Sequence, residues 1–200
     1  MKKILLATKN VDKVREMRLV LNELPAEILS LADFADMPDA VEDGETFEDN
    51  ALIKARFFRE RTGLACLADD SGLEVDALGG MPGVHSARFA GYHADDATNN
   101  QKLLDELAKV GANESAAAYR CVLAFVDIDG TEIITAGKIL GTIKTVAQGT
   151  GGFGYDPYFY INEHRTMAQL SVAEKILISH RGAALKDMIL KLRGKFLPGG

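Results

Sequence analysis

Short apolar runs alternate with amphipathic segments in the N-terminal part of this chain, and that alternation limits it to a small set of folds. Ile4–Ala7 and Leu64–Ala68 have the length and composition of buried strands. Between them, Val14, Met17 and Leu21 recur at helical spacing. Strands separated by helices predict βα units that contribute parallel strands to one sheet.

Turn and cap residues divide the rest of this region. Glu27–Leu31 is expected to form a second strand, and the acidic segment Asp33–Glu45, which contains proline and glycine, is expected to be a loop. Thr46 is a suitable N-cap because acidic residues follow it in the first helical turn. Gly63 is a suitable helix terminator. The sequence therefore predicts a helix between these two residues.

A hairpin interrupts the alternation in the second half of the chain. Tyr119–Asp127 and Thr131–Ala136 flank Asp129-Gly130, a dipeptide typical of a tight β-turn. Further strand is expected through Gly141–Val146, and a last helix over Gly182–Arg193. One antiparallel pair among βα units predicts an α/β fold with a mixed sheet.

Composition narrows the functional class. With 200 residues, of which 47% are hydrophobic, the chain suits a single domain over residues 1–200. The formal charge of -6 argues against nucleic acid as a partner, because duplex binding depends on many phosphate contacts from Lys and Arg. Cys66 and Cys121 lie in apolar runs and are expected to be buried thiols. The absence of an apolar stretch long enough for a membrane span indicates a soluble, cytoplasmic protein without a membrane partner.

Three acidic residues are candidates for metal-assisted hydrolysis. Asp69 and Asp70 directly follow the apolar strand Leu64–Ala68 and are expected at its carboxyl end, and Glu42 lies in the acidic loop. Mg²⁺ prefers such hard oxygen ligands, and a neighbouring carboxylate can accept a proton from an attacking water. The alternative is that Asp69-Asp70-Ser71-Gly72 is simply a turn.

Phosphate-binding groups are expected just after the first strand. Thr8, Asn10 and Lys13 place a hydroxyl, an amide and an ammonium where a strand leads into a helix, which suits an anion. Lys54, on the helix after the acidic loop, is a second candidate cation. The alternative is that Asn10 only caps the helix and that both lysines are solvated surface charges.

The segment Gly149–Gly154 matches a dinucleotide-binding pattern in its letters only. That pattern must open a helix directly after a strand, whereas Tyr155–Tyr160 contains proline and aromatics and is expected to be extended. A glycine-rich loop that presents Phe153 for stacking on a flat heterocycle is the better interpretation. The alternative is a plain turn in which Phe153 fills the core.

Downstream, Lys175, His180 and Arg181 supply further donors. Donors of this kind suit carbonyl oxygens on the edge of a base, and they favour a 6-oxo purine over adenine, which carries an amine donor at that position. A site built around such a hydrogen bond can reject the mismatched base by roughly 10⁴–10⁵-fold.

Taken in order, these motifs resemble the inosine triphosphate pyrophosphatases, also called XTP/dITP diphosphatases. The resemblance covers nearly the whole chain. It is carried by Thr8–Lys13, Glu42 with Thr46-Phe47, Lys54-Ala55-Arg56, Ala68–Leu73, Gly79-Gly80, Pro82-Gly83, Ser86-Ala87-Arg88, Gly149–Pro157, Glu174-Lys175 and Ile178–Gly182.

The resemblance implies an elongated α/β fold of two lobes around a long mixed β-sheet, with the active-site cleft between the lobes, and a homodimer. It implies Mg²⁺-dependent hydrolysis of ITP, dITP and XTP to the monophosphate and pyrophosphate. Asp70 would be the proton acceptor, and the metal ligands would be Glu42, Asp69 and Asp70. Substrate contacts would come from Thr8, Lys9, Asn10, Val11, Asp12, Lys13, Lys54, Ser71, Phe153, Gly154, Tyr155, Asp156, Lys175, His180 and Arg181.

Lys9 departs from the glycine common in the family between Thr and Asn, so the local backbone differs or a cation is added there. Three other functions stay open from the residues alone. They are a related pyrophosphatase for other modified or pyrimidine nucleotides, a nucleotide-binding regulator without turnover, and a dinucleotide oxidoreductase.

Overall fold

The structure, a computed structural model, describes residues 2–196 and has an α/β fold. Its six strands form one sheet in the order β2-β1-β3-β4-β5-β6. β1 pairs in parallel with both β2 and β3, and β5 pairs antiparallel with β6, so the predicted mixed sheet is confirmed. The strands are β1 (Lys2–Leu6), β2 (Ala26–Ser30), β3 (Ala65–Val75), β4 (Glu114–Val126), β5 (Glu132–Lys144) and β6 (Phe159–Tyr160).

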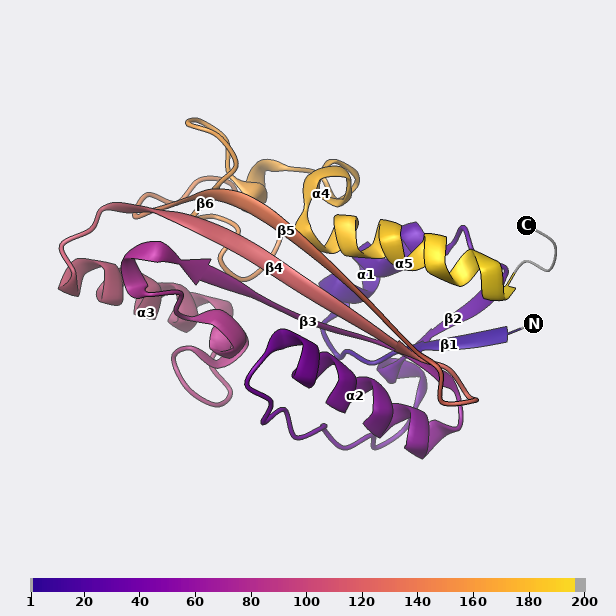
Figure 1. The fold of residues 1–200 in the computed structure, drawn as a ribbon. Coiled ribbons are helices and arrows are strands. Elements are labelled where there is room, and N and C mark those ends of the chain that lie inside the picture. The colour runs from indigo at the N-terminus through magenta and orange to yellow at the C-terminus, as the bar shows by residue number, and fades with distance from the viewer. Residues whose placement is uncertain (1, 197–200) are drawn as a thin grey trace. The chain divides into compact units, whose positions relative to one another are not determined.

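Helices lie between these strands along the chain and follow the last one (Figure 1). Within residues 2–196, no helix is long and apolar enough to span a membrane. The α-helices are α1 (Val11–Leu21), α2 (Phe47–Thr62), α3 (Asp96–Lys109), α4 (Val172–Ile178) and α5 (His180–Phe196). Short 3₁₀ turns occur at Leu31–Asp33, Asp76–Leu78, Gly83–Arg88 and Met167–Gln169.

Local chemistry explains where these helices begin and end. The side chain of Asn10 caps α1 by accepting from the backbone N–H groups of Asp12 and Lys13. Thr46 caps α2 by accepting from the N–H of Asp49, as the sequence predicts. Gly63 ends α2 in the left-handed conformation, at φ 66°, which only glycine adopts without strain.

The chain divides into two compact units, and each is described by itself. Unit 1 contains the described residues 2–70, 121–137 and 181–196, and unit 2 contains residues 71–120 and 138–180. Strands β3, β4 and β5 each contribute residues to both units. The single domain over residues 1–200 stays a prediction, as do the elongated shape and the cleft between lobes.

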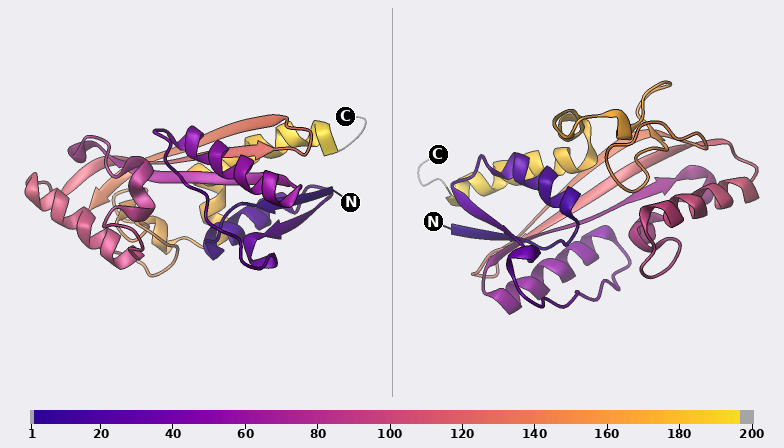
Figure 2. Two further views of the ribbon diagram at one scale, coloured as in Figure 1. Left: turned by 90° about the horizontal axis from the view of Figure 1, so that it is seen from below. Right: turned by 180° about the vertical axis from the view of Figure 1, so that it is seen from behind.

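In unit 1, helices cover both faces of the sheet. One core cluster packs α2 residues such as Ala51 and Phe58 against Leu5, Cys66 and Ala124 of the strands. Figure 2 shows α1 and α5 on the face opposite α2. The Thr135 hydroxyl of β5 donates to the Ala184 carbonyl of α5, which ties that helix to the sheet.

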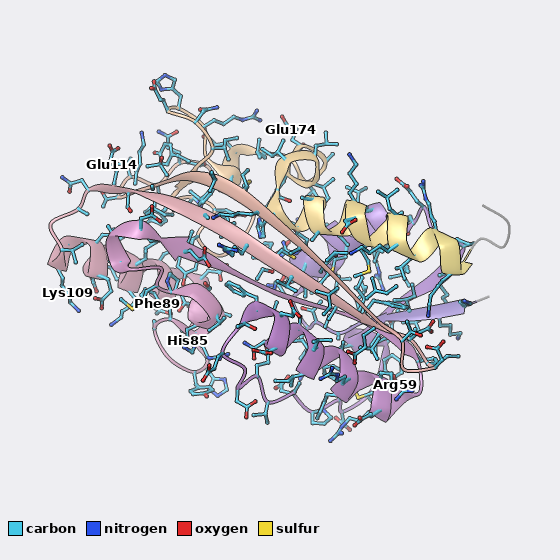
Figure 3. The ribbon with its side chains drawn as sticks, viewed as in Figure 1. Arg59, His85, Phe89, Lys109, Glu114 and Glu174 are labelled. Carbon is cyan, nitrogen blue, oxygen red and sulfur yellow. The ribbon has the colours of Figure 1, made fainter. Side chains whose placement is uncertain are left out.

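Unit 2 has its own core. Leu103 and Leu107 of α3 pack with Leu73 and Val75 of β3, and Phe89, labelled in Figure 3, is partly buried against the same cluster. Aromatic residues join it from both segments of the unit, namely Tyr119 of β4 with Tyr155 and Phe159. α3 also contacts the 3₁₀ turns at Asp76–Leu78 and Gly83–Arg88.

Several predicted boundaries are wrong. The strand predicted over Tyr119–Asp127 begins at Glu114. β3 does not end before Asp69 but continues to Val75. Its register with β1 covers only Ala65–Leu67, and its other neighbour in the sheet is β4. The predicted strands Thr131–Ala136 and Gly141–Val146 are one strand, β5. The last helix begins at His180, so His180 and Arg181 form its first turn rather than preceding it.

Candidate active site

Asp69 and Asp70 lie in the middle of β3 and are both buried. Successive residues of a strand point to opposite faces of the sheet. Asp69 points to the face covered by α1 and α5, where it meets Lys13 and Arg181. Asp70 has the parity of Cys66 and Ala68, which pack against α2. The two acids therefore point to opposite faces of the sheet in unit 1. They are part of a strand, so the alternative of an Asp-rich turn is wrong.

Asp69 is the centre of a buried ionic network. Its Oδ2 accepts from Arg181 Nε at 2.8 Å and from Cys121 Sγ at 3.2 Å, and its Oδ1 accepts from Lys13 Nζ. Arg181 also donates through NH1 to Glu16 Oε2 at 2.5 Å. Burial alone would raise the pKa of Asp69, but the charges of Arg181 and Lys13 hold it well below its usual range. Asp69 is therefore a permanently charged anchor for two cations.

Asp70 has a different environment. Its Oδ2 is buried and has no hydrogen-bond partner among residues 2–196. Burial raises the pKa of Asp70 to about 6, and the nearby charges of Glu42 and Asp69 also raise it, while Lys54 and Lys13 lower it. A buried acceptor without a partner is unfavourable, so its presence marks a candidate functional site.

Glu42 and Lys54 lie beside a small cavity in unit 1. Lys54 Nζ pairs with Glu42 Oε2 at 2.8 Å and donates to the backbone carbonyl of Asp69 at 3.1 Å. The cavity has a volume of about 180 Å³, and its polar lining includes Thr8, Lys9, Glu42 and Lys54. The structure thus gathers residues from two predicted motifs, the loop after β1 and the acidic loop, around one space.

The segment from Thr8 to Lys13, which leads from β1 into the first turn of α1, is ordered by its own side chains. Thr8 Oγ1 accepts from the N–H of Asn10 at 3.2 Å, and Asn10 Oδ1 caps α1. Lys9 pairs with Asp39 at 2.7 Å, and both side chains are largely exposed. The helix cap foreseen for Asn10 is therefore present, and Lys13, which pairs with Asp69, is not a purely solvated charge.

The donor set fits Mg²⁺ through two carboxylates. No group of three or more His, Cys, Asp or Glu side chains is arranged to hold a metal within the described part of the chain. Asp69 directs both oxygens at Lys13, Arg181 and Cys121. Asp70 offers a buried oxygen without a partner, close enough to Glu42 for their charges to interact. One or two carboxylates are a usual protein contribution to Mg²⁺, with phosphates and waters completing its shell.

In unit 2, the glycine-rich segment is a loop, as predicted. Gly149, Gly152 and Gly154 have positive φ, and the two-residue strand β6 follows instead of a helix. A Cβ at Gly152 would come within 2.1 Å of Asp156 Oδ2, so only glycine allows the loop to close around that carboxylate. The segment therefore lacks the helix that a dinucleotide-binding motif requires.

Asp156 and Lys175 hold this loop from inside. Both side chains are buried, and Lys175 Nζ donates to Asp156 Oδ2 at 2.5 Å. The same oxygen accepts from the backbone N–H of Phe153 at 3.1 Å. Lys175 Nζ also lies 4.3 Å from the centroid of the Phe153 ring. The charged pair thus contacts the aromatic ring that the sequence predicts to be a stacking residue.

His180 joins the same group through Tyr119. The two rings are stacked with centroids 4.8 Å apart. Burial raises the pKa of the Tyr119 hydroxyl, and its hydrogen bond to Asp156 raises it further. Tyr155 donates its hydroxyl to the Ser86 carbonyl at 2.7 Å. A compact aromatic and charged group therefore surrounds Asp156 in unit 2.

The predicted site residues fall into these two units. Arg181 lies with the acids of unit 1, not with the loop of unit 2, and Val11 is mostly exposed. Unit 1 holds Thr8, Lys9, Asn10, Val11, Asp12, Lys13, Glu42, Lys54, Asp69, Asp70 and Arg181. Unit 2 holds Ser71, Phe153, Gly154, Tyr155, Asp156, Lys175 and His180.

Sequence reasoning missed Glu16, which binds Arg181, and Tyr119, which bonds to Asp156. Glu16 carried a detectable signal, because it lies three residues after Lys13 and therefore on the same face of α1. Tyr119 carried none, because an aromatic residue within a strand is ordinarily part of the core.

Curated relatives match this chain over most of its length. The dITP/XTP pyrophosphatase of Geobacter sulfurreducens is 50% identical over 186 residues, covering 92% of this chain and 94% of the relative. The dITP/XTP pyrophosphatase of Corynebacterium efficiens is 46% identical over 197 residues, covering 94% of this chain and 95% of the relative.

Solved structures show the same fold. A HAM1 protein from Coxiella burnetii superposes with a TM-score of 0.86 at 42% identity, covering 96% of this chain and 98% of that one. The Ham1 protein of Staphylococcus aureus has a TM-score of 0.83 at 35% identity, covering 97% and 100%. The family model described as the Ham1 family matches residues 4–191, which include every predicted site residue. By sequence and by fold, this chain belongs to the Ham1 family.

Proposed function

We propose that this chain hydrolyses non-standard purine nucleoside triphosphates, namely ITP, dITP and XTP, to the monophosphate and pyrophosphate with the help of Mg²⁺. That the chain is a nucleoside triphosphate pyrophosphatase follows from its membership of the Ham1 family and from relatives named dITP/XTP pyrophosphatase. The observation that carries the proposal is the environment of Asp70. Its carboxylate is buried, its Oδ2 has no hydrogen-bond partner among the described residues, and the charges of Lys54 and Lys13 favour its ionised form.

Asp70 is the proton acceptor in this proposal. A general base must be in its ionised form and must present an oxygen that is not already engaged in a hydrogen bond. Asp70 Oδ2 meets the second condition, and the pKa of about 6 leaves the carboxyl ionised at neutral pH. Asp69, whose oxygens are held by Lys13 and Arg181, is not suited to accept a proton.

Glu42 and Asp70 are the proposed holders of Mg²⁺, and Asp69 as a third ligand stays a prediction. When bound, the metal would neutralise charge on the phosphate oxygens. The Lys54 ammonium contacts Glu42 and the Asp69 carbonyl. In this proposal it also binds a phosphate oxygen of the substrate. Lys13, in the first turn of α1, pairs with Asp69.

The remaining contacts are assigned by chemistry. The segment from Thr8 to Lys13 binds phosphate through its small polar groups and the first turn of α1. Ser71 follows Asp70 on β3 and contacts substrate. For the base, Phe153 supplies a stacking surface, and the segment from Gly154 to Asp156 supplies polar groups for the purine edge. The proposed donors to that edge are Lys175, His180 and Arg181.

Arg181 has a second role in this proposal, because it also binds Asp69 and Glu16.

A homodimer, a cytoplasmic location and the absence of nucleic-acid or membrane partners stay predictions from the sequence and the resemblance.

The test is pyrophosphate release from ITP, dITP, XTP, GTP, ATP and dTTP, each with Mg²⁺ and with a chelator, beside the Asp70→Asn variant. Rapid release from ITP, dITP and XTP that requires Mg²⁺ and Asp70 supports the whole proposal. A profile led by dTTP keeps the hydrolase and overturns the base assignment. Binding without turnover would instead indicate a nucleotide-binding regulator.

A further inference from the structure

The backbone of Gly154 is held by two side chains of α3. Asp96 Oδ2 accepts from the N–H of Gly154 at 2.6 Å, and Asn100 Nδ2 donates to its carbonyl at 2.9 Å. Residues four apart lie on one face of a helix, so both bonds come from adjacent positions on the same surface of α3. One residue of the loop is thus fixed through both of its polar groups. All three residues belong to unit 2.

Gly154 needs such anchors because of its conformation. It adopts φ +61°, and no heavy atom outside its immediate neighbours lies within 4 Å of the place where a Cβ would be. Glycine loses more conformational freedom on ordering than any other residue. A glycine with no side chain to pack is therefore ordered mainly by the hydrogen bonds of its backbone.

Fixing Gly154 also fixes the residues beside it. Phe153 precedes it, and Asp156 accepts from the Phe153 N–H while binding Lys175. These internal bonds hold the segment from Phe153 to Asp156 together. Against α3, Tyr155 packs in the core cluster that contains Leu103 and Leu107, and the two bonds from Asp96 and Asn100 fix the backbone of Gly154.

Asn100 is suited to this task rather than to the core. It is 9% exposed, and its Oδ1 is buried with no hydrogen-bond partner in the described residues. An apolar side chain would avoid that unfavourable acceptor. The function left to the amide is its donor, which binds Gly154.

Asp96 is likewise not needed as a cap. The preceding residue, Asp95, is the N-cap of α3 and accepts from the N–H of Thr98 at 2.8 Å. Asp96 is the first residue of the helix, and its carboxylate engages the loop. A hydrogen bond to an ionised acceptor is stronger than a neutral one.

We propose that Asp96 and Asn100 are positioning residues for base recognition, which place the segment from Phe153 to Asp156 so that it selects the substrate base. This inference rests on the proposed function. Neither residue touches the reacting phosphates in the proposal; both act through Gly154.

The test compares base discrimination in matched variants. Asn100→Ala and Asp96→Ala each remove one bond, and Asp96→Asn retains a weaker, uncharged acceptor. The controls are their neighbours on α3. Asn99 is buried and bonds to the backbone of Ala90 and Ala87, and Asp95 caps the helix. Asn99→Ala and Asp95→Ala therefore disturb the same helix without removing either bond to Gly154.

The measured quantities are the ITP:ATP ratio of kcat/KM, KM and kcat separately, Tm, and the Kd of inosine monophosphate by calorimetry. Loss of one hydrogen bond is expected to lower the ITP:ATP ratio by about tenfold, mostly through a higher KM for ITP. The Kd of inosine monophosphate should weaken in parallel. Asp96→Asn should lose less than Asp96→Ala, and both controls should keep the wild-type ratio even where Tm falls.

Each other result overturns the inference. An unchanged ratio in Asn100→Ala and Asp96→Ala removes the positioning role. An equal loss of the ITP:ATP ratio in the Asn99 and Asp95 controls means that the stability of α3 as a whole, and not the two bonds to Gly154, positions the segment from Phe153 to Asp156. Asp96 is exposed, so its variants are expected to fold and to test the inference even if an Asn100 variant does not fold. A wild-type enzyme without preference for ITP overturns the proposed function and this inference together, whereas normal preference with unaffected variants overturns this inference alone.

Discussion

Asp69 and Asp70 are consecutive residues of β3, yet they have opposite electrostatic environments. Burial would raise both pKa values, but Arg181 and Lys13 hold the pKa of Asp69 well below its usual range. Burial raises the pKa of Asp70 to about 6, with Glu42 and Asp69 opposing its ionisation. The physical reason is the pleat of the strand, which directs neighbouring side chains to different faces. The same residue type therefore serves as an anchor in one position and as the candidate base in the next.

Asp69→Asn is expected to destabilise the protein by about 3–5 kcal/mol, because the guanidinium of Arg181 and the ammonium of Lys13 would lose a buried carboxylate. Urea unfolding at neutral pH measures the change. A loss below about 1 kcal/mol would contradict the anchoring role.

Asp70→Asn, the matched substitution one residue later, should leave stability unchanged or increased, because it removes a buried charge whose oxygen has no partner among residues 2–196. Turnover should fall by roughly 10²–10⁴-fold if Asp70 is the base. Initial rates of pyrophosphate release from ITP check this. A variant with near-normal rate would transfer the role to another group.

Glu16→Gln should be destabilising and should couple to Asp69→Asn. Both carboxylates bind the one guanidinium of Arg181, so the free energies of unfolding of the single variants will not add in the double variant. A double-mutant cycle is expected to show an interaction of about 0.5–3 kcal/mol. Additive effects would show that the two acids act independently.

Lys9→Ala and Asp39→Ala break one exposed ion pair from opposite sides. Each should change stability by no more than about 1 kcal/mol, because exposed pairs are screened by water. If Lys9 also binds phosphate, KM for ITP will rise in Lys9→Ala and not in Asp39→Ala. Equal KM values would limit Lys9 to its pairing with Asp39.

Acid stability should depend on Glu174, which caps α4 next to Lys175. Arg165 and then Ser171 lower the pKa of Glu174 to about 2 in the folded protein, from an ordinary value of 4.5. A depressed pKa contributes stability that is fully present above pH 4.5 and is lost as pH falls toward 2.

Glu174→Gln should therefore be less stable than wild type at neutral pH, and the difference should shrink as pH falls from 4.5 to about 2. Thermal unfolding at a series of pH values measures it. Because the side chain is exposed, a difference that does not vary with pH would point to the cap geometry rather than the charge.

Features with a local cause could be predicted from the sequence. The cap at Thr46, the left-handed Gly63 and the hairpin at Asp129-Gly130 depend on residues within a few positions, and all three are present. The glycine-rich loop was also predictable, because the proline and aromatics after it argue against a helix. The candidate acids, cations and stacking residue were also identifiable, because the chemistry of a side chain does not depend on distant residues.

Features with a distant cause were not. The segment from Asp69 to Gly72 favours a turn by its composition, and only the sheet, in which β3 lies beside β4, keeps it extended. The local sequence predicts only that Arg181 is a donor beside His180. Its partners Asp69 and Glu16 lie 112 and 165 positions away in the sequence.

By itself, the sequence determined the class of fold, the chemistry of the candidate residues and the family, because hydrophobic period, caps and motifs are properties of short segments. Only the tertiary structure decided which acid is bound by cations and which retains a buried oxygen without a partner within residues 2–196. That distinction depends on which helix covers each face of β3, and helix packing joins residues that no local pattern relates.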